Sequence, residues 1–93
     1  MTCIIRKVVG DHYENFAEIA PNEWRLRELV ESLEAWLRDN RSLLAAHHEW
    51  VADIGFSVRK DALGGGPPIT LNLMKMCLEA NLEIFLSEYQ GEA

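Results

Sequence analysis

The sequence has few cysteines and no long apolar run, and these two absences exclude several classes of protein. Only Cys3 and Cys77 occur among the 93 residues, whereas small secreted domains are held together by several cysteine pairs. Both stand beside apolar residues, so we expect two buried free thiols. No segment approaches the roughly 18 apolar residues that span a membrane. The segment Met1–Gly10 is too short and, with Arg6 and Lys7, too charged for a signal peptide, so we expect a cytoplasmic protein.

Basic residues are also scarce. Nine Lys and Arg residues stand against 15 Asp and Glu residues, which gives a formal net charge of −6. The acidic excess is concentrated in residues 11–39, and residues 76–93 carry four Glu residues and no Lys or Arg. Such a field repels phosphate backbones and attracts basic partners, so we expect no nucleic-acid binding, and a basic protein is a fitting partner. A negative surface that only keeps the protein soluble is the alternative.

The length and composition predict one folded domain over residues 1–93. The chain is 48% apolar and 26% charged, which is typical of a globular protein and too apolar for a disordered one. A chain of this size buries roughly 60–65% of its unfolded surface. We therefore expect one modest core, with room for a binding surface but little room for a deep active-site cleft.

Alternating apolar residues predict strands in both halves of the chain. Residues 50–58 alternate between an apolar series that starts at Trp50 and a second series that contains Asp53, as a strand with one buried face does. Residues 3–9 are rich in β-branched residues and predict another strand, and residues 82–89 predict a last one. Together with the helices below, these strands predict an α+β domain, with an antiparallel sheet of three or more strands and helices packed on one face.

The clearest helix is predicted from about Glu23 to Asp39. Its apolar residues recur at the i, i+3, i+4, i+7 spacing of a helix with one buried face. These residues are Leu26, Leu29, Val30, Leu33, Trp36 and Leu37. Asn22 can cap the start of this helix and Asn40 can end it.

Two flanking segments also have helical spacing. In residues 11–20, Asp11 is a candidate N-cap and Glu14 its capping-box partner, which predicts a short helix. A second strand, paired through a hairpin at Gly10–Asp11, is the alternative. Residues 42–48 predict a shorter helix that leads into the strand at residues 50–58.

A loop at residues 62–68 follows that strand, because three consecutive glycines and two prolines do not fit inside a helix. Residues 69–71 predict a short extended piece. Asn72 is then expected to cap a helix of about Leu73–Ala80, and Asn81 is a candidate left-handed terminator.

The glycine run and the histidines do not form a recognised catalytic motif. A Walker loop needs Lys followed by Ser or Thr after its last glycine, whereas Pro67 and Pro68 follow Gly66, so we interpret the loop as a connector. On a helix His47 and His48 would point about 100° apart, so they cannot easily share a metal ion. We therefore predict no catalytic residue, no metal site and no cofactor.

Five residues are predicted to contact a partner: Trp24, Glu28, Glu31, Asp39 and Asp53. On the predicted helix Trp24 leaves the apolar stripe and joins Glu28 and Glu31, and exposed Trp is typical of interface hot spots. The alternative is that Trp24 folds back onto the core. Asp53 lies on the outward series of its strand, where it is either aimed at a partner or simply exposed.

A pattern of apolar positions in roughly two-thirds of the chain carries a family resemblance. Its segments are residues 26–37 and 43–46, the strand at 51–56, the loop at 64–68, residues 69–72, the helix at 73–80, and residues 82–89 with their closing Tyr89. This pattern resembles a group of small bacterial α/β proteins that includes immunity proteins of contact-dependent growth-inhibition and related toxin systems. The N-terminal third departs from the group, which usually begins with more strand. No site residue carries over, because the group has no defined site motif.

The resemblance implies a protein that holds a cognate toxin domain, often a basic nuclease, and blocks its active site. Our leading hypothesis is therefore an immunity protein and not an enzyme. One alternative is a small ligand-binding or enzymatic domain that uses His47 or His48 near the glycine loop. The other is a self-associating structural protein, a homodimer in which the last strand pairs across a two-fold axis.

Overall fold

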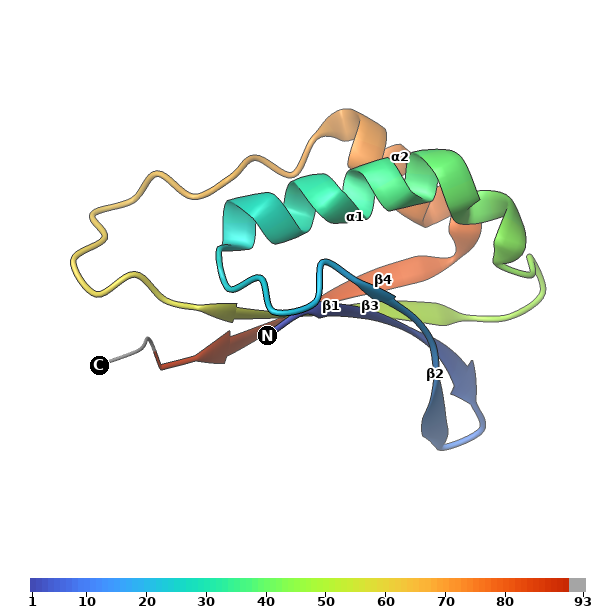
Figure 1. The fold of residues 1–93 in the computed structure, drawn as a ribbon. Coiled ribbons are helices and arrows are strands. Elements are labelled where there is room, and N and C mark those ends of the chain that lie inside the picture. Colours follow the sequence, from blue (N-terminus) through green and yellow to red (C-terminus); the bar gives the residue numbers. More distant parts are fainter. Residues whose placement is uncertain (91–93) are drawn as a thin grey trace.

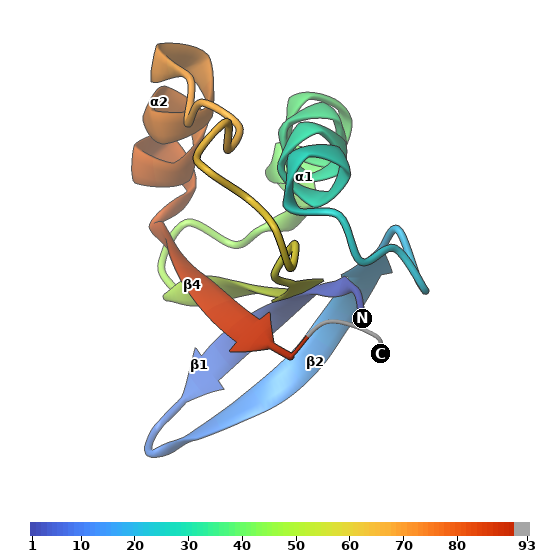
Figure 2. The same cartoon turned by 90° about the vertical axis from the view of Figure 1, so that its left-hand side faces the viewer.

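A sheet of four strands forms one layer of the molecule and two helices form the other (Figure 1). This computed structural model describes residues 1–90. The strands are β1 (Cys3–Val9), β2 (His12–Ile19), β3 (Trp50–Ser57) and β4 (Leu82–Tyr89), and the helices are α1 (Leu26–Asn40) and α2 (Leu71–Ala80). Both helices lie on the same face of the sheet (Figure 2). The predicted α+β domain with helices on one face is therefore confirmed.

The strand order is β2-β1-β3-β4, and the sheet is mixed. The pairs β1–β2 and β1–β3 are antiparallel, as predicted. By contrast, β4 lies parallel to β3, in a register that runs from Trp50 beside Leu82 to Ser57 beside Tyr89. The chain leaves β3 at one end of the sheet and returns through α2 to the other end, and such a crossover makes the next strand parallel.

Residues 11–20 do not form the predicted helix, and the alternative of a hairpin is correct. Gly10 has a φ of +60°, a left-handed conformation that glycine adopts readily and that reverses the chain onto β1. Tyr13 and Phe16 are exposed in β2, so they do not form the buried stripe that a helix would have needed. Pairing with β1 gives the backbone of this segment its hydrogen bonds, and this outweighs the weak local helical spacing.

The predicted helix at residues 42–48 is also absent. A single 3₁₀ turn, Arg41–Leu43, continues α1, and Leu44 then adopts an extended conformation. Leu44 is buried in the core. The chain therefore turns toward the sheet at this point because burial of Leu44 replaces another helical turn.

The two helices begin at other residues than predicted. Helix α1 starts at Leu26, after Arg25 in its cap position, and Asn22 lies outside it with a φ of +70°. Helix α2 is capped by Thr70, whose side chain accepts a hydrogen bond from the backbone N–H of Leu73 at 3.0 Å. The left-handed terminator is confirmed, since Asn81 has φ +57° and ψ +48°.

The core lies between the sheet and the helices. It is formed by the helix-facing residues of the central strands and by the buried faces of α1 and α2, and includes Ile5, Leu29, Leu33, Leu37, Trp50, Ala52, Ile54, Leu73 and Met76. Cys3 and Cys77 are both buried free thiols, as predicted. Burial raises the pKa of Cys3 to about 12 and that of Cys77 to about 11, so both thiols stay protonated. Within residues 1–90, no helix is long and apolar enough to cross a membrane.

Candidate functional site

The sheet face that points away from the helices carries a continuous chain of polar side chains. Arg6 donates from Nε to Asn15 Oδ1 at 3.0 Å and from Nη1 to Asp53 Oδ2 at 2.6 Å. On the other side, the Ser87 hydroxyl donates to Asp53 Oδ1 at 2.6 Å. These four residues come from β2, β1, β3 and β4, so the chain crosses the whole sheet.

The strand registers explain why these side chains meet. Asp53 follows the core residue Ala52 and therefore points to the open face. Arg6 pairs with Val51 on β3, and Ser87 pairs with Gly55. Both residues are thus diagonal neighbours of Asp53 on the same face, within reach of long and polar side chains. The side chains of Arg6 and Asp53 are only about a quarter exposed, so the pair is less screened by water than a fully exposed one.

Three aromatic side chains surround this chain, and each is roughly half exposed: Tyr13, Phe85 and Tyr89. The rings of Tyr13 and Phe85 meet edge to face, with centroids 6.4 Å apart. They come from the two edge strands, and the β1–β2 hairpin bends away from the helices (Figure 1). Strands β1 and β3 lie between these two edge strands, and Val51 on β3 is only 3% exposed.

Gly55 makes room for the third aromatic ring. A Cβ atom at Gly55 would lie 3.1 Å from Cε2 of Tyr89, closer than an ordinary carbon–carbon contact. The Tyr89 ring therefore packs closely against Gly55 on the open face of β3. We call these seven residues the open-face site: Arg6, Tyr13, Asn15, Asp53, Phe85, Ser87 and Tyr89.

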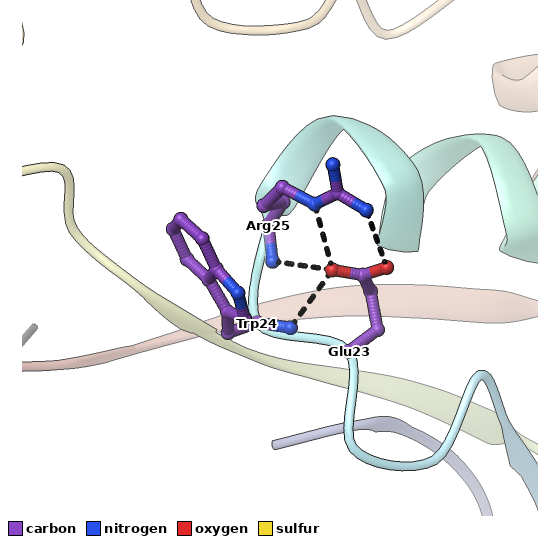
Figure 3. A network of polar contacts seen from close by, with 3 residues as sticks. All are labelled: Glu23, Trp24 and Arg25. Carbon is purple, nitrogen blue, oxygen red and sulfur yellow. Dashed lines mark hydrogen bonds and ion pairs between the residues drawn. The ribbon is translucent and has the colours of Figure 1, made fainter. Parts of the chain in front are cut away.

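A second candidate lies at the amino-terminal end of α1. The Glu23 carboxylate accepts hydrogen bonds from the backbone N–H groups of Trp24 and Arg25, both at 3.0 Å, and from the Arg25 guanidinium (Figure 3). The hydrogen bonds from Arg25, first from its side chain, lower the pKa of Glu23 to about 2. A carboxylate of the chain itself therefore occupies the positive end of this helix.

Trp24 points away from Glu23 (Figure 3) and lines a cavity of about 370 Å³, with Leu26, Phe56 and Val58 among its other apolar walls. The glycine loop forms one side of this cavity. Arg27 donates to the carbonyl of Gly65 at 3.3 Å, and Arg59 donates to that of Gly64 at 2.6 Å. The loop thus turns carbonyl oxygens toward the arginines, which agrees with a connector rather than a phosphate cradle.

The structure does not bring the five predicted contact residues together. Trp24 and Glu28 both line the cavity. Glu31 and Asp39 are exposed further along α1, and Asp39 lies 11 residues after Glu28, roughly 16 Å along the helix. Asp53 lies on the other side of the sheet, where it binds Arg6 and Ser87. The five residues therefore belong to separate surfaces, and only Asp53 is part of the open-face site.

The histidine pair lies far from the glycine loop. The rings of His47 and His48 are 4.2 Å apart, just before β3, whereas the loop follows the other end of β3. An eight-residue strand is about 26 Å long, so the histidines and the glycine loop cannot share a site. The predicted position of His47 and His48 near the glycine loop is therefore wrong. Desolvation, followed by the charges of Lys7 and His47, lowers the pKa of His48. In the described part of the chain, no group of three His, Cys, Asp or Glu side chains could hold a metal ion.

No protein-family model, curated protein or solved structure matches this chain. The resemblance to immunity proteins therefore stays a prediction, and the choice of site depends on geometry.

The sequence alone did not identify Arg6, Asn15 and Ser87 as site residues. Strand alternation does place Ser87 and Asp53 on the outward faces of their strands, and this alternation is the one sequence signal that could have pointed to a site there. It does not show which strands are neighbours or in what register. The pairing of Arg6 with Asp53 spans 47 residues of sequence and is visible only in the folded sheet.

Proposed function

We propose that this chain is a bacterial immunity protein, which binds a cognate toxin domain in the cytoplasm and blocks it through the open-face site. The observation that carries the proposal is the polar chain across all four strands, framed by three half-exposed aromatic rings. Among the described residues 1–90, no helix lies over one face of the sheet, and this face holds the ordered polar groups.

The composition of the site fits a protein partner. Interface hot spots are enriched in Tyr and Arg. Binding is tighter when such side chains are already ordered in the free protein, because less conformational entropy is lost. Arg6 is held by Asn15 and Asp53, and Tyr13 is held against Phe85, so binding would cost these side chains little conformational entropy. The Arg6 guanidinium and the Asp53 carboxylate can still form further hydrogen bonds with a partner, since a guanidinium has five donors and a carboxylate can accept about four hydrogen bonds.

The charge of the site favours a basic partner. Glu18 and Glu83 are exposed on the same face, beside Ile4 and Val51 of the neighbouring strands, while the charges of Arg6 and Asp53 balance each other. The net charge of −6 would speed association with a basic nuclease, and added salt would slow it. The acidic residues Glu28, Glu31 and Asp39 on the helix side offer the competing surface.

The test uses the full chain and the C-terminal domain of the toxin encoded by the adjacent gene. Titration calorimetry should give a one-to-one complex, and co-expression should restore growth to cells that express the toxin domain. Tyr13→Ala should weaken binding by tenfold or more, as loss of a hot-spot residue does. Trp24→Ala and Glu31→Ala, on the helix side, are matched controls that should change the dissociation constant less than threefold.

Two results would contradict the proposal separately. If the adjacent domain is not toxic, or if this chain neither binds it nor restores growth, the immunity function is wrong. If the complex forms but only the helix-side variants weaken it, the function stands and the open-face site is wrong. Circular dichroism of each variant shows that loss of binding does not come from unfolding.

A further inference from the structure

The two edges of the sheet differ in how they are protected against pairing with another strand. Strand β2 forms one edge; its ladder with β1 is interrupted by a register shift at Ile5/Arg6, and the hairpin bends away from the sheet (Figure 1). Strand β4 forms the other edge; it runs in unbroken register along β3 for eight residues and contains no Pro, Lys or Arg. Natural proteins blunt free edges with bulges, prolines or charged side chains, above all lysines. Strand β4 has no bulge, Pro or Lys, and its only charged residues are Glu83 and Glu88.

An exposed apolar stripe on α2 lies beside this unprotected edge. Leu71, Met74 and Leu78 are 82%, 47% and 84% exposed, and their spacing places them on one side of the helix. The side toward α1 is different, because Asn72 binds Glu34 there. The stripe therefore faces away from α1, and Figure 2 shows α2 above β4 at the margin of the molecule.

Strand β4 adds to this apolar surface. Leu86 alternates with the open-face residues Phe85 and Ser87, so it points toward the helix layer, yet it is 55% exposed. We call this surface the α2–β4 flank; it consists of Leu71, Met74, Leu78, Leu86 and the free edge of β4. Exposed apolar side chains that gather on one surface, rather than standing singly, are typical of interaction sites.

We propose that a second copy of this chain covers the α2–β4 flank. The two β4 strands pair antiparallel across a two-fold axis perpendicular to the sheet, which joins the two sheets into one of eight strands. The α2 helices then lie side by side on the same face, stripe against stripe. The open faces remain uncovered, so this dimer does not depend on the proposed function.

A single two-fold axis can pair the β4 strands and also bring the α2 stripes together. Met74 lies six residues before the end of α2, about 9 Å along the helix axis, and Phe85 lies three residues after the start of β4, about 10 Å along the strand. Because α2 and β4 meet at Asn81 and run in opposite directions, the two residues lie at nearly the same level. An axis through Phe85 therefore also passes near the middle of the apolar stripe.

This register is self-complementary. Leu71 then faces Leu78 of the second copy, and Ile84 pairs with Leu86 of the second copy on the helix-facing side. Glu83 lies opposite Ser87, and Glu88 lies opposite Leu82, so no two acidic residues are placed directly across from each other.

Sedimentation equilibrium of the full chain tests the dimer. The wild-type protein should be dimeric at micromolar concentration. Leu78→Glu places a charge in the stripe and should weaken dimerisation at least 100-fold, while the fold is kept because Leu78 is exposed in the monomer. Leu63→Glu is the matched control, because Leu63 is fully exposed on the glycine loop and should leave the dimer intact.

A second variant tests the position of the axis. Phe85→Cys places two thiols directly opposite each other, within the Cα separation that a disulfide allows, so mild oxidation should give a covalent dimer. Tyr13→Cys, on the other edge, should not give one. A wild-type protein that stays monomeric at hundreds of micromolar overturns the proposal, as does a dimer that Leu78→Glu leaves unchanged. Absence of the Phe85→Cys disulfide overturns the two-fold pairing of β4.

Discussion

The carboxylate of Glu34 on α1 accepts a hydrogen bond from the hydroxyl of Thr70, the residue that caps α2, at 2.8 Å. Its second oxygen accepts from the side-chain amide of Asn72 at 3.1 Å. Since Thr70 also accepts from the backbone of Leu73, one carboxylate both orients the cap of α2 and ties the two helices together.

Glu34→Ala should therefore destabilise the protein by about 1–3 kcal/mol, because it removes two charge-assisted hydrogen bonds and loosens a helix cap. Urea unfolding followed by circular dichroism measures this free energy. Glu31→Ala, one turn earlier and exposed on the same helix, should change it by less than about 0.5 kcal/mol. Equal effects of the two substitutions would show that the link between the helices does not contribute.

Stability should fall in acid partly because of Glu23. Its pKa is about 2 in the folded protein against an ordinary value of 4.5, so the unfolded chain takes up the proton first as the pH falls. The stabilisation is therefore complete above about pH 4.5 and is lost as the pH falls toward 2. Glu23→Gln should flatten the dependence of the urea midpoint on pH in this window.

Glu34 acts in the same direction, because its hydrogen bonds from Asn72 and Thr70 lower its pKa. The urea midpoint of the Glu23→Gln protein should therefore still fall with decreasing pH, although less steeply than that of the wild type. Glu31→Gln removes one negative charge without touching either network and serves as the control. If Glu23→Gln and Glu31→Gln give the same profile, the contacts in Figure 3 do not determine acid stability.

Gly55 and Tyr89 should be energetically coupled. Alanine is more favourable than glycine inside a strand by about 0.5–1 kcal/mol, but a Cβ atom at Gly55 would lie 3.1 Å from the Tyr89 ring. Gly55→Ala should therefore stabilise a Tyr89→Ala protein by about 0.5–1 kcal/mol more than it stabilises the wild type. A double-mutant cycle from urea unfolding gives this difference. A value of zero would mean that the Tyr89 ring moves aside without a cost in free energy.

Asn81 should tolerate glycine better than alanine. Its left-handed backbone costs an alanine roughly 1 kcal/mol, a cost that glycine does not bear. Both substitutions also lose the hydrogen bond from Asn81 Nδ2 to the carbonyl of His48, at 3.1 Å, worth about 1 kcal/mol. Thermal unfolding should rank wild type above Asn81→Gly, and Asn81→Gly above Asn81→Ala. A more stable Asn81→Ala would contradict the capping conformation.

Much of the fold could be predicted from local pattern. The alternation in residues 50–58 and 82–89 gave β3 and β4, the apolar stripe that begins at Leu26 gave α1, and Asn81 ended α2 as expected. These features depend on neighbours within a few residues, and so a single sequence contains them. Residues 11–20 were predicted wrongly, because their identity as a strand depends on pairing with β1 rather than on their own spacing.

The candidate site was less predictable than the fold. Asp53 was placed outward by its parity, but its partners Arg6 and Ser87 lie 47 and 34 residues away in the sequence. Glu28 and Glu31 were grouped with Trp24 because a helix from Glu23 would place them on one face, but α1 starts only at Leu26. The predicted contact residues of this region extend from the cavity at one end of α1 to Asp39 near the other.

The sequence by itself determined the charge, the single domain, the apolar faces of the strands and of α1, and the buried state of both thiols, because these follow from composition and short-range periodicity. Only the tertiary structure decided that β4 lies parallel to β3, that four strands bring Asn15, Arg6, Asp53 and Ser87 into one chain, and that α2 leaves an apolar flank beside a free edge. The reason is physical: strand order and register are set by contacts between segments far apart in the chain, and local propensity does not encode them.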